Sequence, residues 1–457
     1  MPSLDKNGNR IRASEPPTAG PAPWWCRWNA RTAWLFGSIL LAWGISTSWQ
    51  RNADFPITDW RSDLRADAAG YYIYLPAAFQ YGFRASAVDT ALLFKAGYGF
   101  DLERTSDRIR TKYPYGTALL QTPFYLCGEL AVGWGTTDGF TETHRRAIEA
   151  AAVFYWVLGL LLLGSALHKW RSPAGWAVVV VLLGISFGSN VFFYMARQAG
   201  YSHIYSFFAV CLALWALLTG DLADGPRWKR TLFHVACALI LVIRSMDIIA
   251  VAGLYAWLYL ERRAVLKDAR FWAGQVVAGL LLAAPQAMYW KLAYGSWMID
   301  SYAGESFKYW DSPHLLKELF SPKNGLVTYA PIMLLLPLGL MEVYRTQRHL
   351  AWLIPCVLGV LVYACASWWS WDFGCGFGCR PAVQYMPFVA FGVLPFLMRK
   401  EERWVRARFA ILPVLGLLVF VHYRAGMQVI PCFNGKHDWD WDWYAVNVVK
   451  AFIGSVP

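Results

Sequence analysis

The sequence predicts an all-α polytopic membrane protein with about eleven transmembrane helices and no large soluble domain. Of its 457 residues, 57% are hydrophobic and only 16% are charged, whereas roughly a quarter of the residues in a soluble domain are charged. The apolar residues occur in runs of about 17–22, the length that crosses a hydrocarbon core of roughly 30 Å. Basic residues concentrate in the short loops between these runs, as they do in cytoplasmic loops.

The spans can be placed one by one along the chain. They are expected at 32–49, 147–166, 174–194, 203–219, 231–244, 247–260, 271–290, 326–341, 350–366, 382–398 and 407–423. With a cytoplasmic N-terminus, the loops left on that side are HKWRS, DGPRWKR, ERRAVLKDAR, EVYRTQRH and MRKEERWVRAR, together with the tail that carries Arg27 and Arg31. Each of them has Lys or Arg near a membrane face, so the C-terminus is expected on the extracytoplasmic side.

One further apolar stretch, 112–132, is long enough to cross a membrane. The loop that follows it must stay outside for the alternation of loops to hold, so this stretch is expected to lie in the interface or to re-enter from the outside. Its prolines and tyrosines fit such a helix. If it spans instead, the count rises by one and every later loop changes side.

The chain then divides into three parts. Residues 1–31 are expected to form a disordered cytoplasmic tail, because their start is polar and rich in Pro and Gly and lacks the apolar core of a signal peptide. The transmembrane domain covers 32–423 and has outer loops at 50–146, 291–325 and 367–381. An extracytoplasmic tail follows at 424–457. The net charge of +12 does not indicate a nucleic-acid partner, because no basic block with interleaved aromatics occurs.

The first outer loop contains the segment RADAAGYYIYLP, in which an acid stands beside tyrosines at the membrane surface. A carboxylate at this place, Asp67, can act as general base for the hydroxyl of an acceptor. Tyr71 and Tyr72 can line an amphipathic wall next to it. The alternative is a solvated acid that pairs with Arg61 or Arg65.

The third outer loop, SWWSWDFGCGFGCRP, combines glycines, tryptophans, an acid and an arginine. Closely spaced glycines let a backbone approach a ligand. Arg380 can grip a phosphate with two parallel hydrogen bonds, while Trp369 and Asp372 offer a stacking face and an acceptor for sugar hydroxyls. The alternative is a tight interfacial turn with an aromatic belt.

Two lysines lie next to turns at the outer face, Lys112 in TKYPYG and Lys323 in SPKNGL. Both suit the phosphate of a lipid, and Tyr113 stands beside the first. A lysine that snorkels to the interface explains either position equally well.

Polar groups at the edges of spans are a further set of candidates: Arg197, His203, Arg244 and Asp247. Ionisable residues within a membrane are costly and therefore suggest function. Arg244 and Asp247 are three residues apart, which fits a structural pair equally well. His203 has no Cys or His at ligand spacing, so a metal role is not expected.

The cysteines divide by their surroundings. Those in apolar stretches are expected to pack as small hydrophobic residues: Cys127, Cys211, Cys237, Cys356 and Cys365. Cys375, Cys379 and Cys432 face the outside, where oxidation occurs in a periplasmic compartment. One hypothesis is a disulfide between Cys432 and the third outer loop, 367–381, which is called the glycine loop below.

These segments together resemble the bacterial GT-C superfamily of integral membrane glycosyltransferases, of the mannosyltransferase or aminoarabinose-transferase type, which use polyprenyl-phosphate-linked sugars. The segments that carry the resemblance are RADAAGYYIYLPAAF, KYPYGTALLQTPF, AGYSHIYSFF, SPKNGLVTYAPIMLL and WWSWDFGCGFGCRP. The resemblance implies a catalytic acid at Asp67, an active site at the outer face and a place in the bacterial inner membrane. Cys375 and Cys379 depart from the family pattern, which often has glycine and proline there.

The expected activity is inverting transfer of a hexose or pentose from a polyprenyl-phosphate donor to an extracytoplasmic glycan or lipid, with Asp67 as base. The residues expected to hold the donor phosphate are Arg380, Lys112, Arg197 and Lys323. Those expected to hold sugar or acceptor are Tyr71, Tyr72, Tyr113, His203, Trp369 and Asp372. No cofactor and no obligatory metal are expected, although Asp63 with Asp67 leaves a divalent cation open. The alternatives are a transporter or flippase of a lipid-linked saccharide, or a non-catalytic partner of a glycosylation complex.

Overall fold

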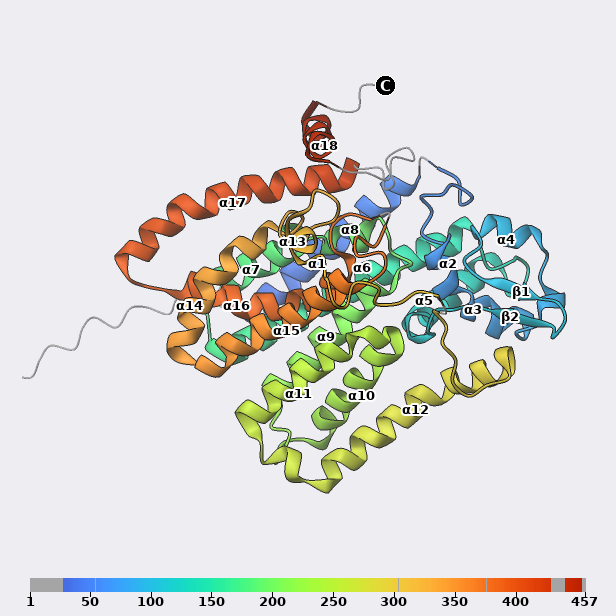
Figure 1. Cartoon of the computed structure of the whole chain (residues 1–457), viewed down its shortest axis with the longest axis horizontal. Coiled ribbons are helices and arrows are strands. Elements are labelled where there is room, and N and C mark those ends of the chain that lie inside the picture. Colours follow the sequence, from blue (N-terminus) through green and yellow to red (C-terminus); the bar gives the residue numbers. More distant parts are fainter. Residues whose placement is uncertain (1–27, 54, 303, 375, 429–439, 454–457) are drawn as a thin grey trace, which may run out of the picture.

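A computed structural model describes residues 28–53, 55–302, 304–374, 376–428 and 440–453, and in these ranges the chain is mostly helical (Figure 1). The first half contains α1 (Ala30–Asn52), α2 (Asp67–Tyr72), α3 (Tyr74–Pro76), α4 (Ala91–Lys95), β1 (Asp101–Glu103), β2 (Arg108–Arg110), α5 (Gly116–Val132), α6 (Glu142–Arg171), α7 (Gly175–Phe187), α8 (Val191–Ala196) and α9 (Ser202–Thr219). The second half contains α10 (Arg227–Ile243), α11 (Ile248–Arg262), α12 (Ala269–Tyr294), α13 (Leu315–Phe320), α14 (Leu336–Thr346), α15 (Arg348–Ser367), α16 (Met386–Met398), α17 (Glu402–Gln428) and α18 (Trp441–Ile453).

The protein is a multi-pass membrane protein. By length and composition, six helical segments in the described ranges can cross a membrane: Glu142–Arg171, Ser202–Thr219, Ala269–Tyr294, Arg348–Ser367, Arg380–Met398 and Glu402–Gln428. Every other predicted span also falls on helical segments, but these are shorter or less apolar. The number eleven is therefore not confirmed.

One predicted span is interrupted. The stretch expected at 174–194 forms two helices, α7 and α8, which are separated by residues 188–190. The break has a tertiary cause, since the Gly188 carbonyl accepts from the Ile332 amide and the Asn190 side chain donates to the Cys379 carbonyl at 2.9 Å. The Asn190 side chain thereby holds the loop that contains Cys379, and the Gly188 carbonyl holds the segment that contains Ile332.

The loops sort into two sets, as the alternation of spans requires. At one end of the helices the three predicted outer loops contact one another, through Lys112 and Glu305 at 2.8 Å and through the backbone of Trp369 and Ser306. The contacts at the other end join predicted cytoplasmic loops: Arg171 with Gln347, His349 with Glu261, Arg230 with Asp268, and Arg399 with Glu342. The basic loops thus lie together, away from Asp67.

The first outer loop folds into a small cap with its own apolar core. Leu64, Tyr72, Ile109 and Phe140 are buried in it, and the antiparallel pair β1–β2 lies at its edge. The cap rests on the end of α12, where the Tyr289 hydroxyl accepts from the backbone of the loop before α5 at 2.7 Å. This packing keeps the start of α2 in a fixed place.

α5 contains most of the apolar stretch 112–132. It is a 17-residue helix with Pro123 inside, and it packs beside the first half of α6 through contacts such as Tyr155 with the Leu120 carbonyl at 2.9 Å. α6 has 30 residues, so at 1.5 Å per residue it measures about 45 Å and exceeds the roughly 30 Å of hydrocarbon. α5 therefore lies beside the part of α6 that exceeds the thickness of the hydrocarbon, at the end near the cap.

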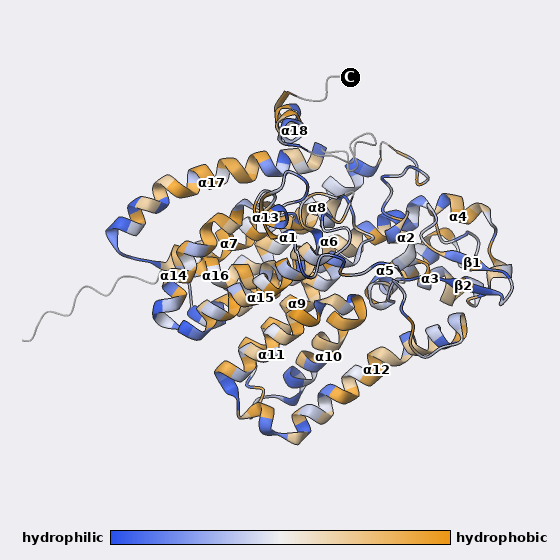
Figure 2. Ribbon diagram, in the orientation of Figure 1, coloured by the Kyte–Doolittle hydropathy of each residue, from blue (hydrophilic) through white to orange (hydrophobic). Residues whose placement is uncertain are grey.

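The outermost helices expose apolar side chains. α12 and α17 are hydrophobic over much of their length (Figure 2), yet only 17% and 6% of their most apolar 18-residue stretches are buried within the chain. Exposed residues such as Leu281 and Phe409 fit contact with lipid, since large exposed apolar patches are rare on soluble proteins.

The predicted boundaries at the two ends of the chain can be compared with the structure only in part. Residues 1–27 of the predicted N-terminal tail lie outside these ranges, and α1 already begins at Ala30. The predicted C-terminal boundary at 424 falls inside α17, which continues to Gln428. Cys375 and Cys432 also lie outside the described residues, so their hypothetical bond stays a prediction.

Candidate active site

Asp67 is the first residue of α2, and its carboxylate joins two distant parts of the chain. Its Oδ1 accepts a hydrogen bond from the Tyr113 hydroxyl at 2.6 Å. Its Oδ2 lies 3.6 Å from Nη1 of Arg380, and the two side chains are 36% and 22% exposed. The structure thus brings together the acid of the first outer loop and the arginine of the third, and leaves both open to a ligand.

The backbone around Asp67 is shaped by close approach. Ala66 has a φ of +49°, in the left-handed region that is uncommon for residues other than glycine, and its amide donates to the Ala96 carbonyl at 2.9 Å. Gly99 lies so close that a Cβ there would stand 2.0 Å from the Ala66 carbonyl oxygen. The turn that aims Asp67 is therefore held by the neighbouring segment of the cap.

Tyr113 is a hydrogen-bond donor to Asp67 at neutral pH. Burial, and then the charge of Asp67, raise the pKa of its hydroxyl, so the group stays protonated. Its ring contacts the Tyr71 ring at a centroid distance of 4.5 Å and the Tyr302 ring at 6.5 Å. These tyrosines form an aromatic wall beside the carboxylate.

A second cation reaches the same wall. Nη1 of Arg244 donates to the Ser202 hydroxyl at 3.0 Å, which in turn donates to the Tyr71 hydroxyl at 3.1 Å. Nε of Arg244 is buried without a partner among the described groups. Asp247, which could have paired with it, instead accepts from Gln384 at 2.8 Å. The position of Arg244 at the edge of a span was its only signal in the sequence.

Lys112 contacts two rings of the aromatic wall, Tyr113 and Tyr302. Its Nζ is 2.8 Å from Oε1 of Glu305 and stands over the Tyr302 ring at 5.2 Å. The indole of Trp369 donates to the other oxygen of Glu305 at 3.4 Å. Two residues predicted for donor phosphate and for sugar therefore meet at one carboxylate, at the junction of the three outer loops.

Lys323 and Asp372 pair with each other. Burial disfavours the charged form of Asp372, but the Lys323 ammonium and the hydrogen bonds around it outweigh this and lower its pKa. Next to them, the Asn324 side chain donates to the carbonyls of Asp372 at 2.8 Å and Gly374 at 2.9 Å, and accepts from the Gly378 amide at 2.9 Å. This segment clamps the glycine loop that leads to Arg380.

Three predicted residues lie in interior positions. Arg197 donates to the Gly426 carbonyl at 2.7 Å, at the end of α17. Tyr72 is fully buried in the cap and donates to the Gly139 carbonyl at 2.5 Å. His203 is buried, with its Nδ1 3.4 Å from Oε1 of Gln384. In the described ranges, none of these side chains forms a hydrogen bond or ion pair with Asp67 or Arg380.

Asp63, which could have shared a cation with Asp67, has other partners. Its carboxylate accepts from the Asn52 side chain at 3.1 Å and from the Ala199 amide at 2.8 Å. It is buried, and this burial raises its pKa. Asp63 is therefore occupied in joining the start of the cap to α1 and α9.

Two solved structures show the same fold as this chain. The chain is similar to the Archaeoglobus fulgidus oligosaccharyltransferase in the apo form, with a TM-score of 0.53 and 10% identity over 90% of this chain and 57% of that one. It is also similar to ArnT from Cupriavidus metallidurans bound to undecaprenyl phosphate, with a TM-score of 0.50 and 14% identity over 93% of this chain and 70% of that one.

The comparison extends to the fold alone. The chain spans 57% of the length of the oligosaccharyltransferase, and the identities are low. No family model and no curated protein matches the sequence.

Proposed function

We propose that this protein is an inverting glycosyltransferase that moves a sugar from a polyprenyl-phosphate donor to an extracytoplasmic glycan or lipid. The observation that carries the proposal is the contact of Asp67 with Tyr113 and Arg380 where the outer loops meet. Two supports accompany it: the GT-C fold, and the undecaprenyl phosphate bound to the structurally similar ArnT.

The reaction needs a base and a site for the departing phosphate. Asp67 takes the proton of the acceptor hydroxyl, and the acceptor oxygen attacks the anomeric carbon. The bond from that carbon to the phosphate oxygen breaks, and the polyprenyl phosphate leaves with the electron pair. Tyr113 orients the carboxylate through its 2.6 Å hydrogen bond.

Arg380 stabilises the negative charge that gathers on the leaving phosphate. Its guanidinium is planar and suited to phosphate oxygens, and it stands 3.6 Å from the base. Lys112 is a second cation at the same junction, and it is free to exchange Glu305 for a ligand because its side chain is 40% exposed. A phosphate is a good leaving group, so the mechanism requires neither a general acid nor an obligatory metal or cofactor.

The proposed site lies on the extracytoplasmic side of a bacterial inner membrane, with the N-terminus in the cytoplasm. The basic loops at the opposite end of the helices support this orientation under the positive-inside rule. A donor held by lipid and an acceptor in water can then both reach Asp67.

The test is transfer of a radiolabelled polyprenyl-phosphate sugar in membranes that contain the wild type or Asp67→Asn. We expect the variant to lose at least about 100-fold in rate, because general-base catalysis contributes roughly 10²–10⁴-fold. Asp59→Asn is a matched control, since Asp59 lies in the same loop and pairs with Arg61 at 2.8 Å. Full activity of a properly expressed Asp67→Asn protein contradicts the mechanism.

The same preparation distinguishes the other classes. Movement of a lipid-linked saccharide across proteoliposomes without a glycosidic product indicates a transporter. A glycan that is lost on deletion of the gene but restored by Asp67→Asn indicates a non-catalytic partner.

A further inference from the structure

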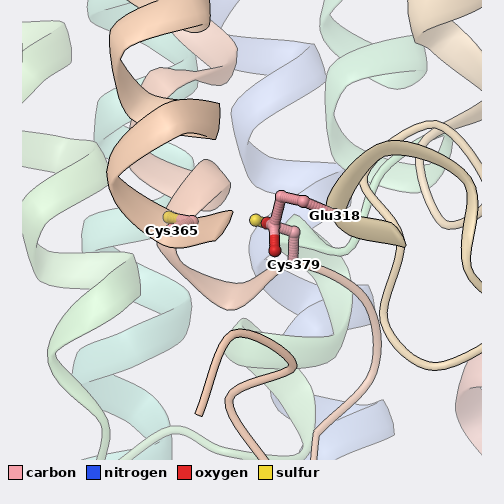
Figure 3. Close-up of side chains that lie close together, drawn as sticks. All are labelled: Glu318, Cys365 and Cys379. Atoms are coloured by element: carbon pink, nitrogen blue, oxygen red, sulfur yellow. The ribbon is translucent and has the colours of Figure 1, made fainter. Parts of the chain in front are cut away.

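Three ligand-type side chains converge at the end of α15 (Figure 3). They are Glu318 from α13, Cys365 from α15 and Cys379 from the glycine loop, and their ligand atoms all lie within 4.8 Å of one another. Their residues are only 2%, 0% and 3% exposed. Among the described residues, this is the one group of three or more Cys, His, Asp or Glu with such spacing.

Glu318 is an acid without a compensating cation. Its Oε1 is buried with no hydrogen-bond partner in the described ranges, and none of the described salt bridges includes it. The titratable groups that act on it most are Cys379 and Asp372, both acids. Apart from a hydrogen bond with the Cys379 side chain, this buried carboxylate has no partner that offsets its charge. Such burial costs several kcal/mol or requires a proton, and a bound cation removes that cost.

The donor set selects the kind of cation. Two cysteine sulfurs and a carboxylate suit Zn²⁺ and related thiophilic ions, whereas Mg²⁺ and Ca²⁺ prefer oxygen alone. At Zn–S distances of about 2.3 Å, tetrahedral ligand atoms stand about 3.8 Å apart. The observed spread of at most 4.8 Å thus needs only a small contraction. The second carboxylate oxygen or a water completes four-coordination.

We propose that Glu318, Cys365 and Cys379 form a structural site for a thiophilic divalent cation of the Zn²⁺ class. On binding, both thiols release their protons to solvent and the ion holds two thiolates and one carboxylate. The bound group carries one net negative charge, which is offset in part by Arg244, a cation that acts on Cys365.

The site ties the scaffold to the proposed active centre. Cys379 directly precedes Arg380, whose guanidinium faces Asp67. The ion joins α13, the end of α15 and the turn that begins at Arg380. It therefore fixes the backbone from which this arginine projects, without touching a substrate.

The competing chemistry for the same residues is a Cys365–Cys379 disulfide, since the sulfurs are close and the compartment is expected to oxidise thiols. A disulfide leaves Glu318 uncompensated, whereas an ion satisfies all three groups. The two chemistries also differ in what is measured, because one gives bound metal and the other a cross-linked pair of peptides.

The experiment measures metal content, not activity, so its outcome is independent of the proposed transferase. The full chain is purified in lipid nanodiscs without chelators, and its zinc is determined by plasma mass spectrometry. We expect about one zinc per wild-type chain, and at least a tenfold lower content in Cys379→Ser and Glu318→Gln. Cys237→Ser is the matched control, since Cys237 is equally buried but remote from the cluster, and it is expected to keep its zinc.

A second measurement does not depend on the folding of the variants. Cobalt(II) exchanged into the wild type gives thiolate-to-cobalt absorption bands only if cysteine sulfurs bind the ion. Zinc content in the wild type no higher than in Cys379→Ser, the absence of these bands, or a Cys365–Cys379 disulfide found by mapping without reduction overturns the proposal.

Discussion

The clamp made by Asn324 gives the sharpest test of how the glycine loop is held. Its side chain makes three hydrogen bonds to that loop, of 2.8, 2.9 and 2.9 Å, and its own φ is +64°. Asn324→Ala removes all three bonds and places an ordinary L-residue in the left-handed region. Asn324→Gly removes the same bonds without the conformational cost.

The magnitude follows from these counts. A hydrogen bond contributes about 1 kcal/mol net, so the glycine variant is expected to weaken the loop by about 3 kcal/mol. The alanine variant loses about 1 kcal/mol more, because a left-handed backbone costs an L-residue roughly that amount. Since about 1.4 kcal/mol is a factor of ten, amide exchange in the loop accelerates by about 10²-fold for Asn324→Gly and about 10³-fold for Asn324→Ala.

The assay is hydrogen–deuterium exchange of the purified chain, read by mass spectrometry on peptides that cover 371–380. Peptides from α16 serve as the internal control and are expected to keep their wild-type rates. If both variants exchange the loop amides at the wild-type rate, the three hydrogen bonds do not hold the loop. Equal acceleration in the two variants contradicts the conformational part of the reasoning.

Three further changes test other parts of the structure. Tyr113→Phe removes the hydroxyl that donates a hydrogen bond to Asp67. The variant is expected to lower kcat of sugar transfer by about 10–100-fold, since a hydrogen bond to a charged group contributes about 1.5–3 kcal/mol. An unchanged kcat in the transfer assay contradicts the orienting role of Tyr113. Gly70→Ala places a Cβ 2.2 Å from the Tyr113 ring and is expected to destabilise the protein by about 2 kcal/mol or more. Gly279→Ala, with no atom within 4 Å of the added Cβ, is expected not to lower Tm, because alanine is favoured over glycine inside a helix. Equal Tm values of the two variants in thermal unfolding refute the packing argument. Because the pKa of Asp372 is lowered in the folded state, the ionised carboxylate stabilises the protein above the ordinary pKa near 4, and this stabilisation is lost as the pH falls further. Between pH 7 and pH 3, the Tm of Asp372→Asn is therefore expected to fall less than the Tm of the wild type. Parallel curves of Tm against pH for the two proteins contradict the stabilising role of the Asp372 carboxylate.

The sequence was sufficient to predict the class of fold, because membrane spans depend on local composition. Runs of apolar residues and the charge of short loops are visible without tertiary contacts. The exact spans were less predictable where the backbone breaks for a tertiary reason, as at 188–190, where Asn190 leaves the helix pattern to hold the Cys379 carbonyl. The local composition around Asn190 cannot predict a hydrogen bond to Cys379, which lies far along the chain.

The candidate site divides in the same way. Asp67 and Arg380 were predicted from local patterns, an acid among tyrosines and an arginine after glycines, and the two side chains are neighbours in the structure. Lys323 and Asp372 were also predicted to bind ligands, but the two side chains pair with each other. A contact between two loops cannot be read from the sequence of either loop. Tyr72 illustrates a third limit, since adjacent residues of a helix face different sides and only the cap core shows that it points inward.

The joining of Asp67 to Arg380 across the chain also has a consequence for biosynthesis. The ribosome makes the acid early, whereas the cap around it is complete only after α12 has been made, because Tyr289 belongs to the core of the cap. The arginine that faces it emerges only after α15 has been inserted. A chain that ends before Arg380 therefore contains Asp67 without the cation that faces it, so only the complete chain can form this ion pair.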